Sequence, residues 1–138
     1  MIDDIVLGKK ESIERCIRRI REYYARPSDL PFEEDYLRRD AIAMNIQRAA
    51  ELCIDLANHV VKARKLGIPK ESRASFTMLA REGLIPKELS KLLEGMVGFR
   101  NVLIHDYREL DIEVMKDVIE HRLDDLVAFT VYIMEIFK

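Results

Sequence analysis

Side chains able to bind a phosphate group and to move a proton gather in one short stretch of the chain. Arg100, Asn101, His105, Asp106 and Tyr107 lie there among apolar neighbours. A guanidinium is planar and permanently charged, so Arg100 suits the charge of a phosphate group. An imidazole ordinarily titrates at about pH 6.5, so His105 suits general acid–base catalysis. These residue types indicate phosphate chemistry at this stretch.

Helix geometry decides which of these side chains can meet. Asn101 and His105 are four residues apart, so they are neighbours on one helical face, and Asn101 could orient the imidazole or hydrogen-bond a sugar. At roughly 100° per residue, Arg100 and Tyr107 lie within about 20° of each other, whereas Arg100 and His105 lie about 140° apart. Arg100 and His105 can share a target only if the helix distorts near His105 or a second chain brings its own copy. The spacing therefore favours a dimer with the site at its interface.

Each of these side chains also has a purely structural interpretation. An arginine at a helix end often caps carbonyl groups, and a histidine near a helix terminus is often a hydrogen-bonded polar group. Tyr107 could be a half-buried packing residue whose hydroxyl contacts water. The crowding of so many polar groups beside apolar surface is the observation that favours a functional site.

The same stretch resembles a known family signature. Arg100 and His105 match the Arg-x4-His motif of the HEPN superfamily, and with Tyr107 they match the Arg-x4-His-x-Tyr motif of HepT-like toxins. Residues 45–47 and 51–59 are also similar to that family. The resemblance therefore covers nearly the whole chain.

This resemblance implies a homodimeric ribonuclease toxin of a type VII toxin–antitoxin system, acting on RNA without a metal ion or cofactor. Two copies of the motif would face one cleft, with Arg100 and His105 as catalytic residues and Asn101 and Asp106 in support. It also implies a partner, a minimal nucleotidyltransferase antitoxin of the MntA type. That partner would silence the toxin by transferring AMP to Tyr107, on the same helix face as Arg100.

Two other interpretations remain open. A non-catalytic helical module could present nucleotide or substrate to such a transferase, because the motif can hold a phosphate without cutting anything. A purely structural dimerisation domain would have to treat the motif residues as coincidental.

Two further groups of polar residues have weaker signals. Glu51, Asp55 and His59 form a ladder along one helix, but a metal site needs converging ligands, and no suitable partner residue is apparent. We expect this ladder to line a dimer cleft or to be a satisfied helix face. His121, beside Arg122, is expected on the solvated surface.

The composition favours helices as the elements that position the motif. The 138 residues are 49% hydrophobic and 35% charged, with only 5 Gly and 4 Pro. Few turn-forming residues favour long helices joined by short loops and exclude disorder or a many-turned β-sandwich. We expect residues 1–138 to form one all-α, HEPN-like antiparallel bundle of four to five helices.

Hydrophobic periodicity places these helices. We expect helices over residues 3–25, from Pro31 to Leu66 with Gly67 as cap, over 72–82 ending at Gly83, from Pro86 through Leu103, and from Asp111 to the end after a break near 107–110. The last helix is apolar on more than one face. This favours cover by a second copy of the chain; the alternative is that its last turns pack under the first helix.

Several classes are excluded or favoured by simple features. No apolar run reaches the roughly 18–20 residues of a membrane span, and Asp3 and Asp4 stand where a signal peptide carries basic residues. We therefore expect a cytoplasmic protein without membrane contact. Cys16 and Cys53 lie among apolar neighbours, which favours buried reduced thiols.

The charge is unevenly distributed along the chain. The net charge is −2, yet residues 60–100 carry nine Lys or Arg against four acidic residues, and residues 101–138 carry four against nine. This pattern fits a polyanion-binding surface, a self-complementary pairing surface or a solvated helix face.

Overall fold

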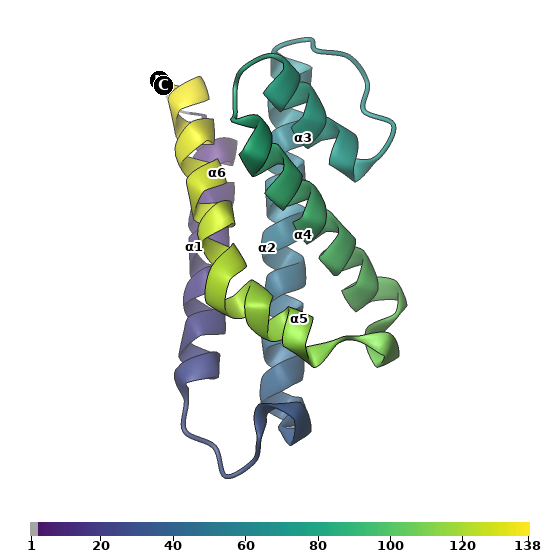
Figure 1. Ribbon diagram of the computed structural model, residues 1–138. Helices are drawn as coiled ribbons and strands as arrows, with labels where there is room; N and C mark the ends of the chain where they lie inside the picture. Colours follow the sequence, from purple (N-terminus) through teal and green to yellow (C-terminus); the bar gives the residue numbers. More distant parts are fainter. Residues whose placement is uncertain (1–2) are drawn as a thin grey trace.

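The computed structural model describes residues 3–138, which form a helical bundle without strands (Figure 1). The helices are α1 (Asp4–Ala25), α2 (Tyr36–Ala63), α3 (Ser72–Arg81), α4 (Lys87–His105), α5 (Ile112–Asp117) and α6 (Leu123–Ile136). Short 3-10 turns at Phe32–Glu34 and Tyr107–Glu109 join neighbouring helices. The predicted all-α fold is confirmed, and residues 1–2 of the expected domain lie outside the described residues.

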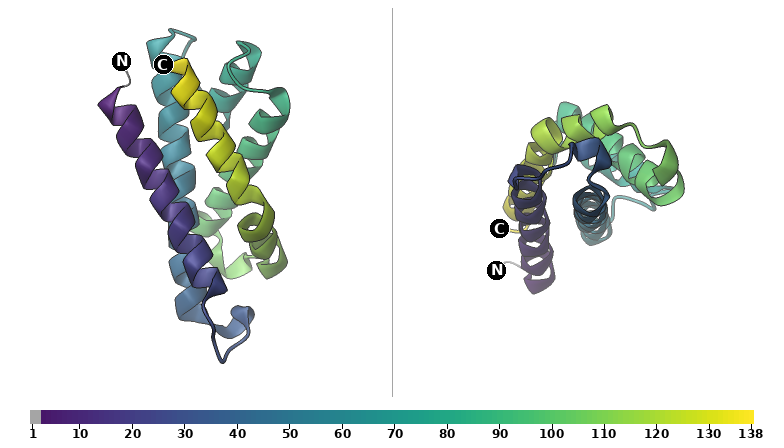
Figure 2. Two further views of the ribbon diagram at one scale, coloured as in Figure 1. Left: turned by 90° about the vertical axis from the view of Figure 1, so that its left-hand side faces the viewer. Right: turned by 90° about the horizontal axis from the view of Figure 1, so that it is seen from below.

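The long helices α1 and α2 run side by side and antiparallel, and the others are arranged around them along a curve (Figure 2). The last helix, α6, packs against α1, α2 and α4. The pair α3 and α4 lies on the other side of α2, so α4 carries residues 100–105 along one edge of the bundle. In the described part of the chain, no helix is long and apolar enough to cross a membrane.

Carboxylates of aspartates begin three of the helices. The Asp3 carboxylate accepts from the Ile5 N–H (2.8 Å), and Asp35 accepts from the first turn of α2. Asp111 accepts from two N–H groups of α5, which confirms the predicted cap. The expectation that the second helix starts directly after Pro31 is wrong, because a 3-10 turn intervenes and Asp35 satisfies the free N–H groups further on.

Two predicted helix ends have different outcomes. Gly83 follows α3 with φ +72°, as its lack of a side chain predicts. The second helix, however, ends at Ala63 rather than Leu66, because Lys65, the residue after the C-cap Arg64, already takes the left-handed conformation (φ +53°). The Leu66 N–H then donates to the Val61 carbonyl (3.0 Å), which closes the helix end before the glycine is reached.

The last predicted helix is continuous from Ile112 to Ile136, but it contains a π-helical segment. Residues Val118–Arg122 form a π-helical segment between α5 and α6. One face, with Phe129 and Ile133, is fully buried, so the alternative of packing under the first helix holds for that face. Other apolar side chains of α5 and α6 stay exposed: Val114, Val127, Val131 and Tyr132 are between 38% and 56% exposed.

The core joins all the long helices. Phe76 of α3 meets Phe129 of α6 edge to face, with ring centroids 5.3 Å apart. Cys16 and Cys53 are buried free thiols, as predicted, and burial raises the pKa of both. A high thiol pKa keeps both groups protonated and unreactive.

Truncation of Phe129 should destabilise the whole bundle, because this ring is fully buried and bridges α6 to α3. We expect Phe129→Ala to lower the free energy of unfolding by about 3–5 kcal/mol in a denaturant titration. Ile68→Ala, at a side chain that is 92% exposed, is the control and should change it by less than about 0.5 kcal/mol. Similar losses in both variants would contradict this account of the core.

Candidate functional site

The helix that carries the motif stays regular up to His105. The Asp106 N–H donates to the Val102 carbonyl (2.9 Å) and closes the last turn of α4. Asp106 itself then leaves the helix, with φ −135° and ψ 38°. Because α4 does not distort before this point, Arg100 and His105 of one chain point about 140° apart.

Arg100 is half-buried and directed at the start of α3. Its Nη2 lies 3.4 Å from the hydroxyl of Ser72, the first residue of that helix. Its Nε is buried without a hydrogen-bond partner among the described residues. The guanidinium is thus held against the junction of α3 and α4, where it can present its remaining N–H groups to an anion.

His105 and Asp106 are exposed at the end of α4, and Asn101 is half-buried one turn earlier. The regular helix places Asn101 and His105 on one face, as the sequence predicts. No hydrogen bond joins these two side chains within residues 3–138, so Asn101 does not hold the imidazole in the single chain. The imidazole is therefore free to reach a group brought from outside the chain.

Tyr107 lies apart from Arg100, which corrects the expectation that the two share a face. The helix ends at His105, so Tyr107 belongs to the following 3-10 turn. Its hydroxyl donates a hydrogen bond to the Asp40 carboxylate of α2. The Arg39 guanidinium covers the ring, 5.9 Å from its centroid. Tyr107 and Arg100 therefore contact different helices, α2 and α3.

The surroundings of Tyr107 disfavour its ionised form. Burial raises the pKa of the phenol above its ordinary value, and the hydrogen bond to Asp40 raises it further. The positive Arg39 opposes this shift. At neutral pH the hydroxyl is consequently a protonated donor held at one carboxylate, and a reaction at its oxygen has to move that proton.

Sequence reasoning misses Ser72, Arg39 and Asp40. Nothing in the spacing links Asp40 to Tyr107, because 67 residues separate them. The only local signal is the adjacent pair of opposite charges at 39 and 40 in the first turns of a helix, and such pairs are common on solvated helix surfaces. Tertiary packing of α2 against the end of α4 creates this part of the site.

The acidic ladder on α2 is a satisfied helix face. Glu51 accepts from Gln47 (3.3 Å), Asp55 pairs with Lys9 (3.4 Å), and the His59 Nε2 lies 3.0 Å from an Asp3 carboxylate oxygen. Within residues 3–138 no three His, Cys, Asp or Glu side chains converge as a metal site would require. His121 is exposed, as expected.

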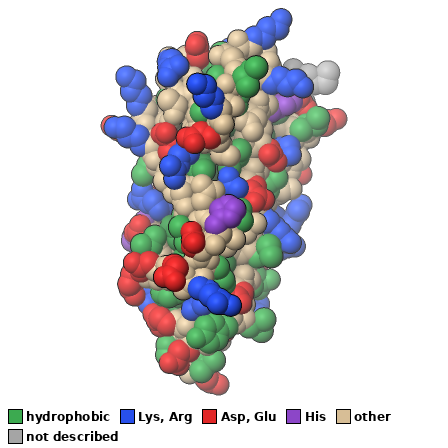
Figure 3. Space-filling view, turned by 90° about the vertical axis from the view of Figure 1, so that its right-hand side faces the viewer, with side chains coloured by type: hydrophobic (Ala, Val, Ile, Leu, Met, Phe, Trp, Pro, Cys, Tyr) green, Lys and Arg blue, Asp and Glu red, His purple; other side chains and the backbone are tan. Residues whose placement is uncertain are grey.

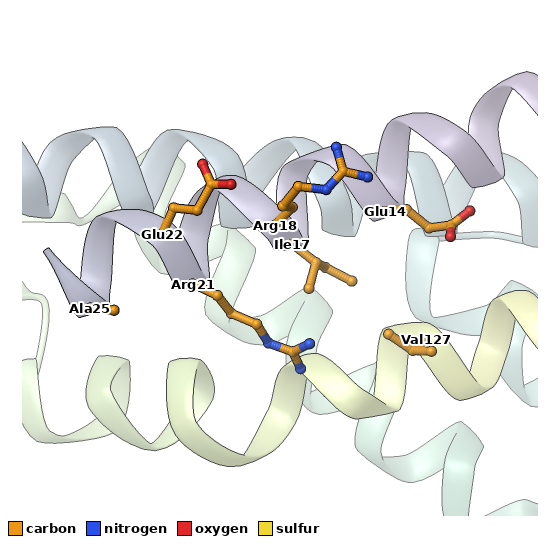
Figure 4. Close-up of a pocket in the computed structure, with 7 residues that line it drawn as sticks. All are labelled: Glu14, Ile17, Arg18, Arg21, Glu22, Ala25 and Val127. Atoms are coloured by element: carbon orange, nitrogen blue, oxygen red, sulfur yellow. The ribbon is translucent and has the colours of Figure 1, made fainter.

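A cavity of about 550 Å³ between α1 and α6 lies away from the motif (Figure 4). Arg18, Arg21 and Glu22 of α1 and Val127 of α6 are among its lining residues. The Arg21 side chain crosses towards α6, where it pairs with Asp124 (2.8 Å). None of the residues from 100 to 107 lines this cavity, so it is not the candidate site.

Comparisons with known proteins point to one family. The family model described as "Ribonuclease HepT-like" matches residues 13–133. The chain is 43% identical over 128 residues to the mRNA nuclease HepT of Shewanella oneidensis, covering 93% of this chain and 95% of that protein.

Two solved structures have the same fold over nearly the whole chain. A crystal structure of a toxin–antitoxin with AMP-PNP gives a TM-score of 0.91 at 41% identity, covering 96% of this chain and 99% of that one. The tri-AMPylated HEPN toxin of S. oneidensis in complex with MNT antitoxin gives a TM-score of 0.91 at 42% identity, covering 97% and 99%.

Removal of the Asp40 charge should lower the pKa of Tyr107. A carboxylate beside the phenol disfavours the phenolate, so Asp40→Asn removes a cause of the upward shift. We expect the Tyr107 phenolate to appear at lower pH in Asp40→Asn. Its titration is followed by ultraviolet absorbance, after subtraction of the signal of the same chain carrying Tyr107→Phe. Asp4→Asn, at an exposed position on α1, is the charge-matched control and should leave the titration unchanged. An unchanged or higher pKa in Asp40→Asn would refute the assigned contact.

Proposed function

The chain belongs to the HepT-like ribonuclease family, and from this premise we propose that it cleaves RNA at a composite site built by two copies of the chain. Arg100 and His105 are the catalytic residues of this proposal. The observation that carries it is the regular end of α4, which presents a half-buried guanidinium and an exposed imidazole on divergent faces of one helix. The described residues 3–138, with their single connected core, are part of one HEPN-like domain.

Cleavage in this proposal is an in-line attack by the 2′-hydroxyl of RNA on the adjacent phosphorus. One His105 takes the proton of that hydroxyl, and the His105 of the second copy gives a proton to the departing 5′-oxygen. Arg100 stabilises the charge that builds up on the phosphorane oxygens. Asn101 and Asp106 support the site by orienting the imidazole and the sugar. These steps use no metal ion and no cofactor.

A dimer follows from the angle between the two catalytic side chains. One regular helix cannot turn Arg100 and His105 towards the same phosphate, but two copies related by a twofold axis can exchange these groups. Val127 and Val131 of α6, one helical turn apart and 38% and 56% exposed, give a second reason for pairing. Larger complexes would be assembled from such dimers.

Regulation in this proposal is the transfer of AMP to Tyr107 by a nucleotidyltransferase antitoxin of the MntA type. The S. oneidensis toxin, 42% identical to this chain, is tri-AMPylated in complex with its MNT antitoxin. Here Tyr107 is half-buried on the turn after α4. An adenylate on it would lie beside Arg39, which can pair with the added phosphate, rather than on the face of Arg100.

A cytoplasmic location fits this activity. RNA and ATP are both present in that compartment, and the two buried cysteines are reduced there.

Loss of the imidazole should abolish most of the cleavage. We expect His105→Ala to cut single-stranded RNA roughly 10²–10⁴-fold more slowly than the wild-type chain, because general acid–base catalysis is lost. The assay is run with a chelator present, and wild-type cleavage should persist there. His121→Ala, which removes an exposed histidine outside the motif, is the matched control and should retain activity. If the wild type leaves RNA intact, the chain is a non-catalytic binding module.

The composite site has its own test. Wild-type chains are unfolded and refolded with a large excess of an inactive double variant, Arg100→Ala with His105→Ala, so that most wild-type chains pair with a variant chain. A shared site that needs the His105 of both copies should then lose most of its activity per wild-type chain. If each site is built by one chain, the activity per wild-type chain stays unchanged.

The modified residue can be identified by mass. Incubation of the chain with the antitoxin and ATP should add whole AMP increments to the intact mass, and Tyr107→Phe should show none. Tyr132→Phe, at a tyrosine of α6 that is 38% exposed, is the control and should still be modified. Increments that remain in Tyr107→Phe would place the modification elsewhere.

A further inference from the structure

A basic groove between α3 and α4 starts next to Arg100, and we propose that it binds the phosphodiester backbone of a single-stranded RNA. This inference rests on the proposed ribonuclease activity and adds to it the path of the substrate strand outside the cleavage site. It also gives a role to the basic segment that the sequence shows between residues 60 and 100.

The groove is continuous along α3 and α4. Two cavities, of about 650 Å³ and about 300 Å³, share Thr77, Arg81 and Glu94 in their walls. The basic side chains that line this α3–α4 groove are Lys70, Arg73, Arg81, Lys87 and Lys91. Figure 3, which views the right-hand side of Figure 1, shows basic side chains standing out over the upper part of this face, and acidic ones gathered lower down.

The cations of the groove are available to a ligand. None of the five forms an ion pair within residues 3–138, although seven other Lys and Arg side chains do. The carboxylate of Glu94, inside the groove, accepts hydrogen bonds from Thr77 (3.0 Å) and Ser90 (3.3 Å) instead. The second acidic lining residue, Glu71, is exposed. The groove therefore presents a net positive charge to solvent.

Two of these cations stand where the fold itself disfavours them. Lys87 is the first residue of α4, in the same first turn as the acidic Glu88, and Arg73 is the second residue of α3. The start of a helix carries a partial positive charge, so a cation there typically costs about 0.3–1 kcal/mol. Lys87 and Lys91 are also like charges four residues apart, which is unfavourable in a helix. A bound polyanion removes both penalties.

The groove leads directly to the candidate catalytic arginine. The Arg73 guanidinium lies against the backbone of α4 at Gly98, where a Cβ would come within 2.7 Å of its Nη2. Its neighbour Ser72 contacts Arg100 (3.4 Å). Glycine at position 98 thus lets a guanidinium of the groove reach the α4 backbone two residues before Arg100.

The lining selects the backbone of RNA rather than its bases. Neither cavity has an aromatic side chain in its wall, so bases have no surface on which to stack. Lysine and arginine contacts to phosphates position a strand without reading its sequence. The ten residues of α3 extend over about 15 Å, room for roughly four phosphates of a stacked strand. Because Arg100 lies at one end of the groove, an RNA strand bound at the cleavage site can continue along the groove.

The test measures RNA binding in the His105→Ala background, so that it does not depend on cleavage. A fluorescent single-stranded RNA is titrated with this protein and with the same protein carrying Lys87→Gln and Lys91→Gln. We expect the dissociation constant to rise several-fold at low salt. The slope of log affinity against log salt should fall by roughly 0.7 for each lost phosphate contact.

The control carries Arg18→Gln and Arg19→Gln on α1, two exposed cations outside the groove that also lack an ion pair within the described residues. It removes the same charge and should keep both the affinity and the slope. Equal losses in the two double variants would mean that only net charge matters, and no loss with Lys87→Gln and Lys91→Gln would also overturn the groove. If the variant with Lys87→Gln and Lys91→Gln binds RNA normally but loses binding to the antitoxin, the groove binds a protein partner instead.

A cleavage assay keeps the groove separate from the proposed function. In the His105 wild-type background, the Lys87→Gln and Lys91→Gln variant should lose more activity on a long RNA than on a dinucleotide, which is too short to reach the groove. A wild-type chain that cleaves neither substrate refutes the ribonuclease proposal, whereas the binding comparison still decides the groove.

Discussion

The angular spacing of Arg100 and His105 on a regular helix is the constraint on which the function of this fold depends. Five residues of α-helix turn two side chains about 140° apart, and α4 keeps its hydrogen bonds up to the Asp106 N–H. A helix that unwound earlier would let one chain assemble both groups. Because it does not unwind, a site that needs both groups at one phosphate has to draw them from two chains. In the proposed ribonuclease, dimerisation is then a requirement of the chemistry, and the exposed Val127 and Val131 of α6 are available to contact a second copy.

The end of α4 separates two chemical tasks that the sequence places only two residues apart. His105 is the last residue of the helix, and Tyr107 is already turned towards Asp40 on α2. The tyrosine therefore sits in its own electrostatic setting, in which burial and a carboxylate keep its proton in place. In the regulation proposed above, an adenylate attached there would add negative charge next to α2 and not against Arg100. It would inhibit cleavage by occupying the approach to His105 and by repelling a polyanionic strand.

Much of the fold could be predicted from the sequence because local signals and packing agree. The periodic apolar positions, the Asp111 cap and the glycine after α3 each point to the element that forms. The end of α2 could not be placed, since Lys65 takes a backbone conformation that usually belongs to glycine. The π-helical segment at 118–122 could not be predicted either. Its buried residues, Val118 and Ile119, fit the apolar pattern of an ordinary α-helix equally well. In the site, helix geometry gives the angle between Arg100 and His105. It does not give the contact of Tyr107 with Asp40 or that of Arg100 with Ser72, because both depend on tertiary packing.

The start of α4 departs from the local rule that three other helix starts of this chain obey. Asp3, Asp35 and Asp111 place a carboxylate at the starts of α1, α2 and α5. The first residue of α4 is instead the cation Lys87, with Glu88 beside it and a like charge, Lys91, four residues later. Departures from local consistency of this kind are expected where function, rather than folding, selects a residue. A strand of phosphates in the groove supplies the missing counter-charge at both helix starts and reaches Arg100 in the same contact. The substrate thereby completes an electrostatic arrangement that the free chain leaves open.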